Sequence, residues 1–164
     1  MTNKSNFTAA TGTYYVMTYL SRECIHAACT IGNAPFVDVL DSSIDGNSST
    51  TIQVKTAKYA RGNKGKINER SSWHFKYDVA KEESKPHFYA LVDLMGEDCE
   101  GKEHWIPTVY IIPSSVISEQ CKLQGWSDKS FILDLSKTLL EQYKNNWTPL
   151  KQALSPSVTN IWGD

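Results

Sequence analysis

The sequence contains no long uncharged hydrophobic run among its 164 residues. A membrane-spanning helix needs about 20 consecutive apolar residues, and no stretch of this chain comes near that length. The opening stretch, MTNKSNFTAATGTYY, also lacks the apolar core of a secretory signal peptide. The sequence therefore predicts a soluble, cytoplasmic protein with no membrane partner.

Cysteine is scarce, and its spacing is irregular. The four cysteines stand at positions 24, 29, 99 and 121 and form no CxxC pair. A domain of this length can bury a sufficient core without disulfides. Zinc binding by Cys99, His104 and Cys121 is an alternative, but ligand pairs in structural zinc sites usually lie about two to four residues apart. We therefore expect thiols that pack in a reducing compartment.

No charge of one sign dominates the chain. The formal net charge is -1 and the pI is about 6.4, which excludes a uniformly basic protein. Any contact with nucleic acid must then come from a local basic patch.

The chain also lacks internal repeats, low-complexity tracts and linkers, so we expect a single domain over residues 1–164, with a core over about 12–144 and a tail over 145–164. Hydrophobic periodicity and turn residues predict an α/β layered domain around a mixed sheet. The predicted elements are a helix within 12–30, a hairpin of strands 35–40 and 50–56, a loop over 58–72, strands 88–94 and 109–112, a helix after Pro113, a helix over 131–144 and a surface-wrapping tail.

Three polar residues stand out in the predicted hairpin. Side chains alternate between the two faces of a strand, so Gln53 and Lys55 share one face. If the turn is centred on Asp45-Gly46, Asp38 lies opposite Gln53 with Lys55 diagonal to both. A carboxylate and an amide oxygen can hold Mg²⁺, and a lysine can neutralise charge on a phosphate or orient a water.

The runs GNAPFVD, residues 32–38, and IQVKT, residues 52–56, resemble the metal site of the PD-(D/E)XK nuclease superfamily, which has the restriction-endonuclease-like fold. The segments at 88–94 and 109–114 also resemble core strands of small bacterial members. The resemblance implies a central mixed sheet flanked by helices and hydrolysis of DNA phosphodiesters with Mg²⁺ or Mn²⁺ and no organic cofactor. It makes Asp38 and Gln53 the metal ligands and Lys55 the catalytic lysine.

Two features depart from the family pattern. The second ligand is more often Glu or Asp, although some active members are similar in having Gln, as at Gln53. Many relatives place a glutamate early in the first helix, where this chain has Thr13, and Glu23 lies too far along the helix to replace it. An inactive nucleic-acid-binding or assembly module, or a purely structural interaction domain, is therefore an alternative to the endonuclease.

The predicted loop after the hairpin is locally basic. It leaves the strand that carries Lys55, so its cations can contact phosphates beside a scissile bond; a solvated loop without function is the alternative reading. The cations that we expect to bind DNA are Lys58, Arg61, Lys64, Lys66 and Arg70. Cleavage of both strands commonly needs two active sites, which favours a homodimer. The tryptophans are expected to pack in the core and at the surface, and the histidines receive no role.

Overall fold

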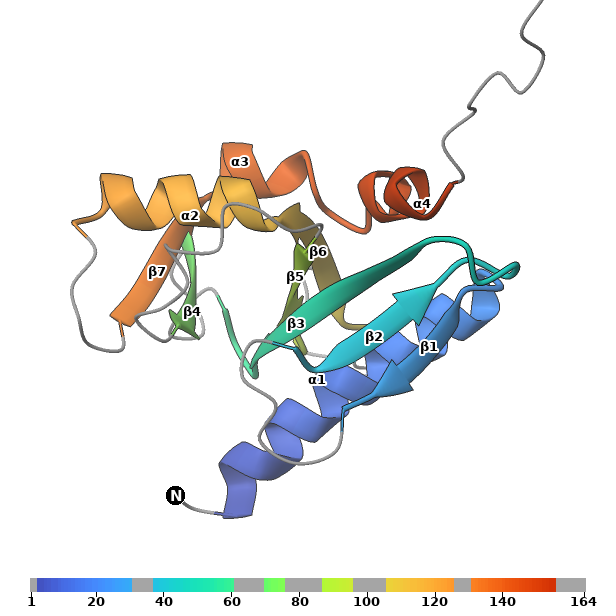
Figure 1. Ribbon diagram of the computed structural model, residues 1–164. Coiled ribbons are helices and arrows are strands. Elements are labelled where there is room, and N and C mark those ends of the chain that lie inside the picture. Colours follow the sequence, from blue (N-terminus) through green and yellow to red (C-terminus); the bar gives the residue numbers. More distant parts are fainter. Residues whose placement is uncertain are drawn as a thin grey trace, which may run out of the picture.

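The computed structural model describes residues 3–30, 37–60, 70–75, 87–95, 106–125 and 131–155. Figure 1 shows its helices and strands in chain order. The helices are α1 (Asn3–Arg22), α2 (Ser114–Leu123), α3 (Lys137–Glu141) and α4 (Thr148–Leu154). The strands are β1 (His26–Cys29), β2 (Val39–Ser42), β3 (Ser49–Ala57), β4 (Arg70–Phe75), β5 (His87–Asp93), β6 (Thr108–Pro113) and β7 (Phe131–Ser136).

The central sheet has five strands in the order β1-β2-β3-β5-β6. Strands β3 and β5 are parallel, and the other neighbours are antiparallel. A separate antiparallel pair, β4 and β7, forms a second sheet. The α/β class and the mixed central sheet flanked by helices are therefore confirmed.

Two hydrophobic clusters cover the opposite faces of the central sheet. Helices α1 and α4 pack on one face, where they form the first cluster with side chains of β2, β3, β5 and β6. The small sheet β4–β7 and helices α2 and α3 pack on the other face and form the second cluster. The first cluster includes Val16, Leu20, Val39, Ile52, Val54, Val92, Ile111, Trp147, Leu150 and Leu154. The second includes Trp73, Phe75, Tyr89, Leu91, Tyr110, Ile112, Ile117, Cys121, Leu133, Leu135 and Leu140.

The predicted hairpin is present and has the predicted register. Val39 lies opposite Ile52, as it must if the turn is centred on Asp45-Gly46. The connection is wider than a two-residue turn, because the backbone N–H of Ser43 donates to the Ser48 carbonyl at 2.9 Å. The Asp45 carboxylate accepts from the Ser43 hydroxyl at 2.5 Å, and Gly46 has a φ of 73°. These contacts fix the turn and thus the register of both strands.

The first helix lies further toward the N-terminus than predicted. It runs from Asn3 to Arg22, and the last part of the predicted helix contains β1 instead. Helix α1 approaches β3 closely at Gly12, where an added Cβ would lie 1.9 Å from Thr56 Oγ1. The predicted helix is therefore present, but it begins and ends earlier in the chain than predicted.

The C-terminal third differs most from the prediction. The stretch expected to form one helix over 131–144 is strand β7 followed by the short helix α3. In β7, Leu133 and Leu135 are buried while Ile132 is exposed, which is the alternation of a strand. The expected surface tail contains α4, whose Leu150 and Leu154 belong to the first cluster. Strand β4 was also missed, because residues 70–72 were placed in a loop.

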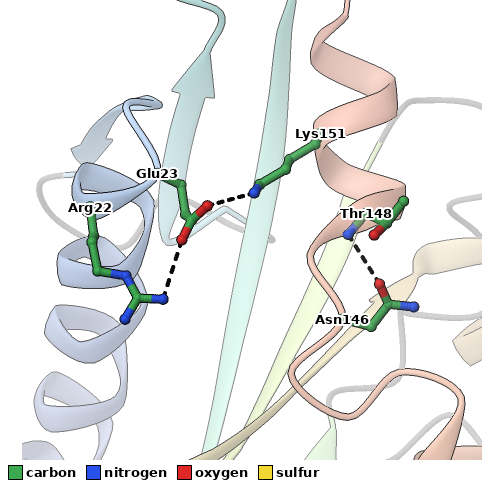
Figure 2. Close-up of polar contacts among 5 residues, drawn as sticks. All are labelled: Arg22, Glu23, Asn146, Thr148 and Lys151. Carbon is green, nitrogen blue, oxygen red and sulfur yellow. Dashed lines mark hydrogen bonds and ion pairs between the residues drawn. The ribbon is translucent and has the colours of Figure 1, made fainter.

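An ion-pair network ties α4 to the end of α1 (Figure 2). The Glu23 carboxylate accepts from Lys151 at 2.5 Å and from Arg22 at 3.2 Å. These two hydrogen bonds, the one from Lys151 first, lower the pKa of Glu23. The N–H of Thr148 donates to the Asn146 side chain at 3.1 Å as α4 begins. Glu23, which lies too far along the chain to replace the glutamate of the family pattern, thus forms ion pairs with one residue of α1 and one of α4.

Over the ranges given above, none of the helices combines the length and the hydropathy that crossing a bilayer would require.

Candidate functional site

Gln53 and Lys55 lie on the face of β3 that meets the second cluster. In the parallel pairing with β5, Gln53 is beside Tyr89 and Lys55 is beside Leu91, and both partners belong to that cluster. Ile52 and Val54 face the first cluster. The alternation predicted for this strand is therefore confirmed.

Asp38 directly precedes β2 and is joined to both neighbouring strands. Its backbone N–H donates to the Ile52 carbonyl at 3.0 Å, and its carbonyl accepts from the Thr30 N–H at 3.0 Å. The side-chain Oδ2 accepts from the Val54 N–H at 2.7 Å. Val54 stands between Gln53 and Lys55, so the carboxylate lies beside the β3 backbone between these two residues.

The ladder between β2 and β3 changes at this point. Its last pair is Val39 with Ile52, while the N–H of Asp38 also turns to the Ile52 carbonyl. The Asp38 side chain then occupies the place of the next backbone acceptor for Val54. The predicted pairing of Asp38 directly opposite Gln53 is not part of this ladder, because Asp38 bonds instead to Ile52 through its N–H and to Val54 through its carboxylate. The sharing of one ion by the side-chain oxygens of Asp38 and Gln53 stays a prediction.

The Gln53 side chain carries one of several buried polar atoms that have no hydrogen-bond partner in the described part of the chain. Gln53 is 8% exposed, and its Oε1 is buried without a hydrogen-bond partner among the described residues. Buried polar groups in native proteins are nearly always paired, so such an atom requires an explanation. A carbonyl oxygen of this kind can accept a hydrogen bond or coordinate a cation.

Lys55 is half-buried and lies beside an aromatic ring. Its Nζ is 5.9 Å from the centroid of Phe75, the last residue of β4. Strand β4 pairs with β7, so a strand from the far end of the sequence supports the wall beside the lysine. The sequence signal for this contact was weak, because β4 follows a long polar stretch.

The basic residues predicted to contact DNA are only partly described. Lys58 follows the end of β3 and is exposed, with its Nζ 5.6 Å from the Tyr59 ring centroid. Arg70 is exposed at the start of β4. Arg61, Lys64 and Lys66 lie outside the described residues. The two described cations therefore stand at the ends of the strands that flank the predicted loop.

A shallow concave surface of about 600 Å³ lies over the outer three strands of the central sheet. By alternation, Leu40 and Thr51 share the face of Gln53, and Leu40 is 50% exposed. The surface is lined by His26, Ala27, Ala28, Leu40, Asp41, Ser42, Ser49, Thr50 and Thr51. His26 and Asp41 are the titratable residues among those that line this surface.

Asp41 is a buried carboxylate that sequence reasoning missed. It is 2% exposed and accepts a hydrogen bond from Thr50 Oγ1 at 3.0 Å, while its Oδ2 has no partner among the described residues. Burial raises the pKa of Asp41 to about 6, against the opposing effect of the Thr50 hydrogen bond. Asp41 shares the face of Val39, opposite to that of Gln53, so it belongs to a different environment from the candidate site.

The described residues contain no ready-made cluster of acidic, histidine and cysteine ligands. No cluster of three or more His, Cys, Asp or Glu side chains suited to a metal is found in the ranges that the structure describes. Thr13 donates its hydroxyl to the Ala9 carbonyl at 3.2 Å. Cys121 is fully buried in the second cluster, and burial raises the pKa of its thiol to about 11. The other two residues of the zinc alternative, Cys99 and His104, lie outside the described residues.

The described tryptophans are packing residues. Trp73 is buried and donates to the Val92 carbonyl at 3.2 Å. Trp147 is buried and stacks on Tyr19 with a centroid distance of 4.1 Å.

Comparison of the chain with protein-family models, with curated proteins and with solved structures finds no match.

Proposed function

We propose that this protein is a metal-dependent endonuclease of the PD-(D/E)XK type that hydrolyses DNA phosphodiester bonds with Mg²⁺ or Mn²⁺. The observation that carries the proposal is the buried, unpartnered Oε1 of Gln53 on the strand that binds the Asp38 carboxylate. Leaving a buried acceptor unsatisfied costs about 1–3 kcal/mol. A bound cation would remove that cost and would explain a buried glutamine in this place.

The donor set suits a hard divalent cation. Mg²⁺ prefers oxygen ligands and is commonly held by one or two carboxylates, with waters and substrate phosphates completing the shell. Asp38 offers a carboxylate whose orientation is fixed by the Val54 N–H, and Gln53 offers a neutral oxygen from the adjacent strand. The residues present therefore fit a site with one protein charge that a phosphate completes.

Each side chain has a separate task in this proposal. When bound, the cation would supply an activated water and withdraw charge from the phosphate. Asp38 and Gln53 hold and orient the cation. Lys55, from the same face of β3 as Gln53, places its ammonium where negative charge grows on the phosphate and stabilises that charge. Lys58 and Arg70 contact phosphates on either side without reading sequence.

The fold supports the proposal as well. The resemblance implies a mixed sheet flanked by helices with the metal site on a hairpin, and the mixed sheet, the α1 helix beside it and the β2–β3 hairpin are all present. Hydrolysis of both strands of a duplex would need two copies of such a site, which we propose a homodimer supplies.

The proposal is tested with Asp38→Asn. Asparagine keeps an oxygen that can accept from the Val54 N–H but removes the only negative charge that we place in the site. We expect Mn²⁺ binding and plasmid cleavage to be lost while the melting temperature stays close to that of the wild type. Asp45→Asn, an exposed aspartate of the same hairpin, is the matched control and should cleave normally. A fully active Asp38→Asn protein would refute the proposal.

Gln53 is tested in the same assay. Gln53→Ala removes the oxygen and should weaken Mn²⁺ binding measured by isothermal titration, whereas Gln53→Glu adds charge at the same reach and should tighten it with activity preserved. If Gln53→Ala binds Mn²⁺ as the wild type does, Gln53 is not a ligand.

A second candidate function is a nucleic-acid-binding module that has lost turnover. The single carboxylate of the site favours it, since Gln53 brings no charge and Thr13 is bonded within its own helix. This candidate predicts DNA binding without cleavage in Mg²⁺ or Mn²⁺ and no Asp38-dependent uptake of Mn²⁺.

A further inference from the structure

The ring beside Lys55 is held more firmly than the lysine itself. Phe75 is 1% exposed, whereas Lys55 is half-buried. The Phe75 ring lies 5.4 Å from the Tyr89 ring and 6.0 Å from the Phe131 ring, centroid to centroid. Phe75 is also paired with Phe131 in the β4–β7 ladder. The ring therefore has one position, set by two sheets at once.

Lysine brings the opposite property to the site. Its ammonium stands at the end of a flexible four-carbon stem, and a catalytic cation must be held in a narrow range of positions to act. The face of an aromatic ring attracts an ammonium through its quadrupole when the two lie within about 6 Å. The separation of 5.9 Å between Lys55 Nζ and the Phe75 centroid satisfies that condition.

We propose that Phe75 is a positioning residue that holds the Lys55 ammonium in place for the reacting phosphate, a role that rests on the proposed nuclease function. The second sheet then does more than cover the core. Its strand β4, which lies between β3 and β5 in sequence, carries the Phe75 ring that limits the positions open to the Lys55 ammonium. Phe75 touches neither substrate nor metal in this proposal and acts only through Lys55.

The contact itself is tested by proton NMR. An aromatic ring shifts the signals of protons above its face, so the Lys55 ε-methylene protons, assigned with a Lys55→Arg variant, should be displaced upfield in the wild type. The displacement should disappear in Phe75→Leu and persist in Phe75→Tyr. Identical Lys55 signals in the wild type and in Phe75→Leu would overturn the proposal.

The role of the contact is tested by kinetics on a DNA substrate. Phe75→Leu should lower kcat by about five- to tenfold, as expected for loss of one cation–π contact, and leave Mn²⁺ affinity unchanged. Phe75→Tyr should restore kcat to within about twofold. Phe131→Leu removes a ring from the same aromatic group without removing the ring beside Lys55, so it serves as the matched control for packing.

The outcomes separate the two proposals. If Phe131→Leu lowers kcat as much as Phe75→Leu, the effect is one of packing, and positioning is overturned. An active protein without the NMR displacement overturns positioning alone. A protein that shows the displacement but no metal-dependent cleavage overturns the nuclease function and, with it, the catalytic purpose of the contact.

Discussion

At the scale of single residues, Gln53 and Asp41 are among several buried side chains that have an oxygen without a hydrogen-bond partner in the described part of the chain, and these two lie on opposite faces of the central sheet. Gln53 faces the second cluster, whereas Asp41 lies on the same face of β2 as Val39, which belongs to the first cluster. The neutral amide of Gln53 can coordinate a cation or accept a hydrogen bond from a water. A carboxylate can instead take up a proton, so burial of Asp41 makes stability depend on pH.

The sign of that dependence follows from the pKa of Asp41, which burial raises to about 6. In the unfolded chain an aspartate has a pKa of about 3.9, so the fold prefers the protonated form. The contribution to stability is fully present below about pH 4 and is lost as the pH rises through about 6. The full shift of about two pH units corresponds to roughly 3 kcal/mol.

We therefore predict that Asp41→Asn removes this pH dependence. Measured by urea unfolding, the wild type should become progressively less stable than the variant between about pH 4 and about pH 7. The exposed Asp45 is the control of opposite sign, because hydrogen bonds, first from the Ser43 hydroxyl, lower the pKa of Asp45. Asp45→Asn should lose stability relative to the wild type as the pH rises. A constant difference between wild type and Asp41→Asn would contradict the assignment.

These residues also show how far the sequence predicts the site. The shared face of Gln53 and Lys55 follows from alternation along one strand, and the register follows from a local turn. The ring of Phe75 reaches Lys55 only because β4 pairs with β7, which lies far away in sequence. The burial of Asp41 likewise depends on what packs over its face. Local patterns thus predict the polar residues of the candidate site but not the residues that pack around them.

At the scale of elements, most errors concern where a helix ends. The apolar spacing from Tyr15 to Ala28 suggested one long helix, but the chain turns at Cys24, which has a φ of 58°. The N–H of Cys24 donates to the Ser21 carbonyl at 3.1 Å, and the N–H of Ile25 donates to the Leu20 carbonyl at 3.0 Å. This is a Schellman cap, a motif that usually carries glycine at the left-handed position.

Strand β7 was mistaken for a helix for a related reason. A short apolar run is ambiguous between the two periods, and FILDLS was read together with the helical residues that follow it. Pairing with β4 decides in favour of a strand. The hairpin and the strands β5 and β6 were predicted because turn residues or long apolar runs bound them locally.

The cap at Cys24 leads to a prediction about stability. For a residue other than glycine, the left-handed backbone conformation destabilises the folded state by roughly 1–2 kcal/mol. Glycine avoids that steric cost but loses more conformational entropy on folding. Cys24→Gly should therefore stabilise the protein by about 0.5–1 kcal/mol, measured as a higher urea midpoint. Cys29→Gly makes the same chemical change in strand β1 and should destabilise. If both variants lose stability, the cap is not strained at Cys24.

At the scale of the whole molecule, the central sheet is shared by both hydrophobic clusters. Strand β5 contributes Val92 to the first cluster and Leu91 to the second. Strand β6 does the same with Ile111 and Ile112. The small sheet β4–β7 therefore packs on strands whose other faces pack against α1 and α4. Loss of either cluster exposes strands on which the other depends, so we expect the chain to unfold as one unit.

The last prediction tests this cooperativity with one variant in each cluster. Leu154→Ala in α4 removes a side chain of the first cluster, and Leu135→Ala in β7 removes one of the second. Each should lower the free energy of unfolding by about 2–5 kcal/mol, and far-UV circular dichroism and tryptophan fluorescence should still give one common midpoint. Ile132→Ala, on the exposed side of β7, should change stability by less than about 0.5 kcal/mol. If circular dichroism and fluorescence instead give separate midpoints for Leu135→Ala, the small sheet β4–β7 unfolds independently of the central sheet. Because Phe75 lies on β4, the aromatic ring beside Lys55 would then be lost before the β2–β3 hairpin that carries the lysine unfolds.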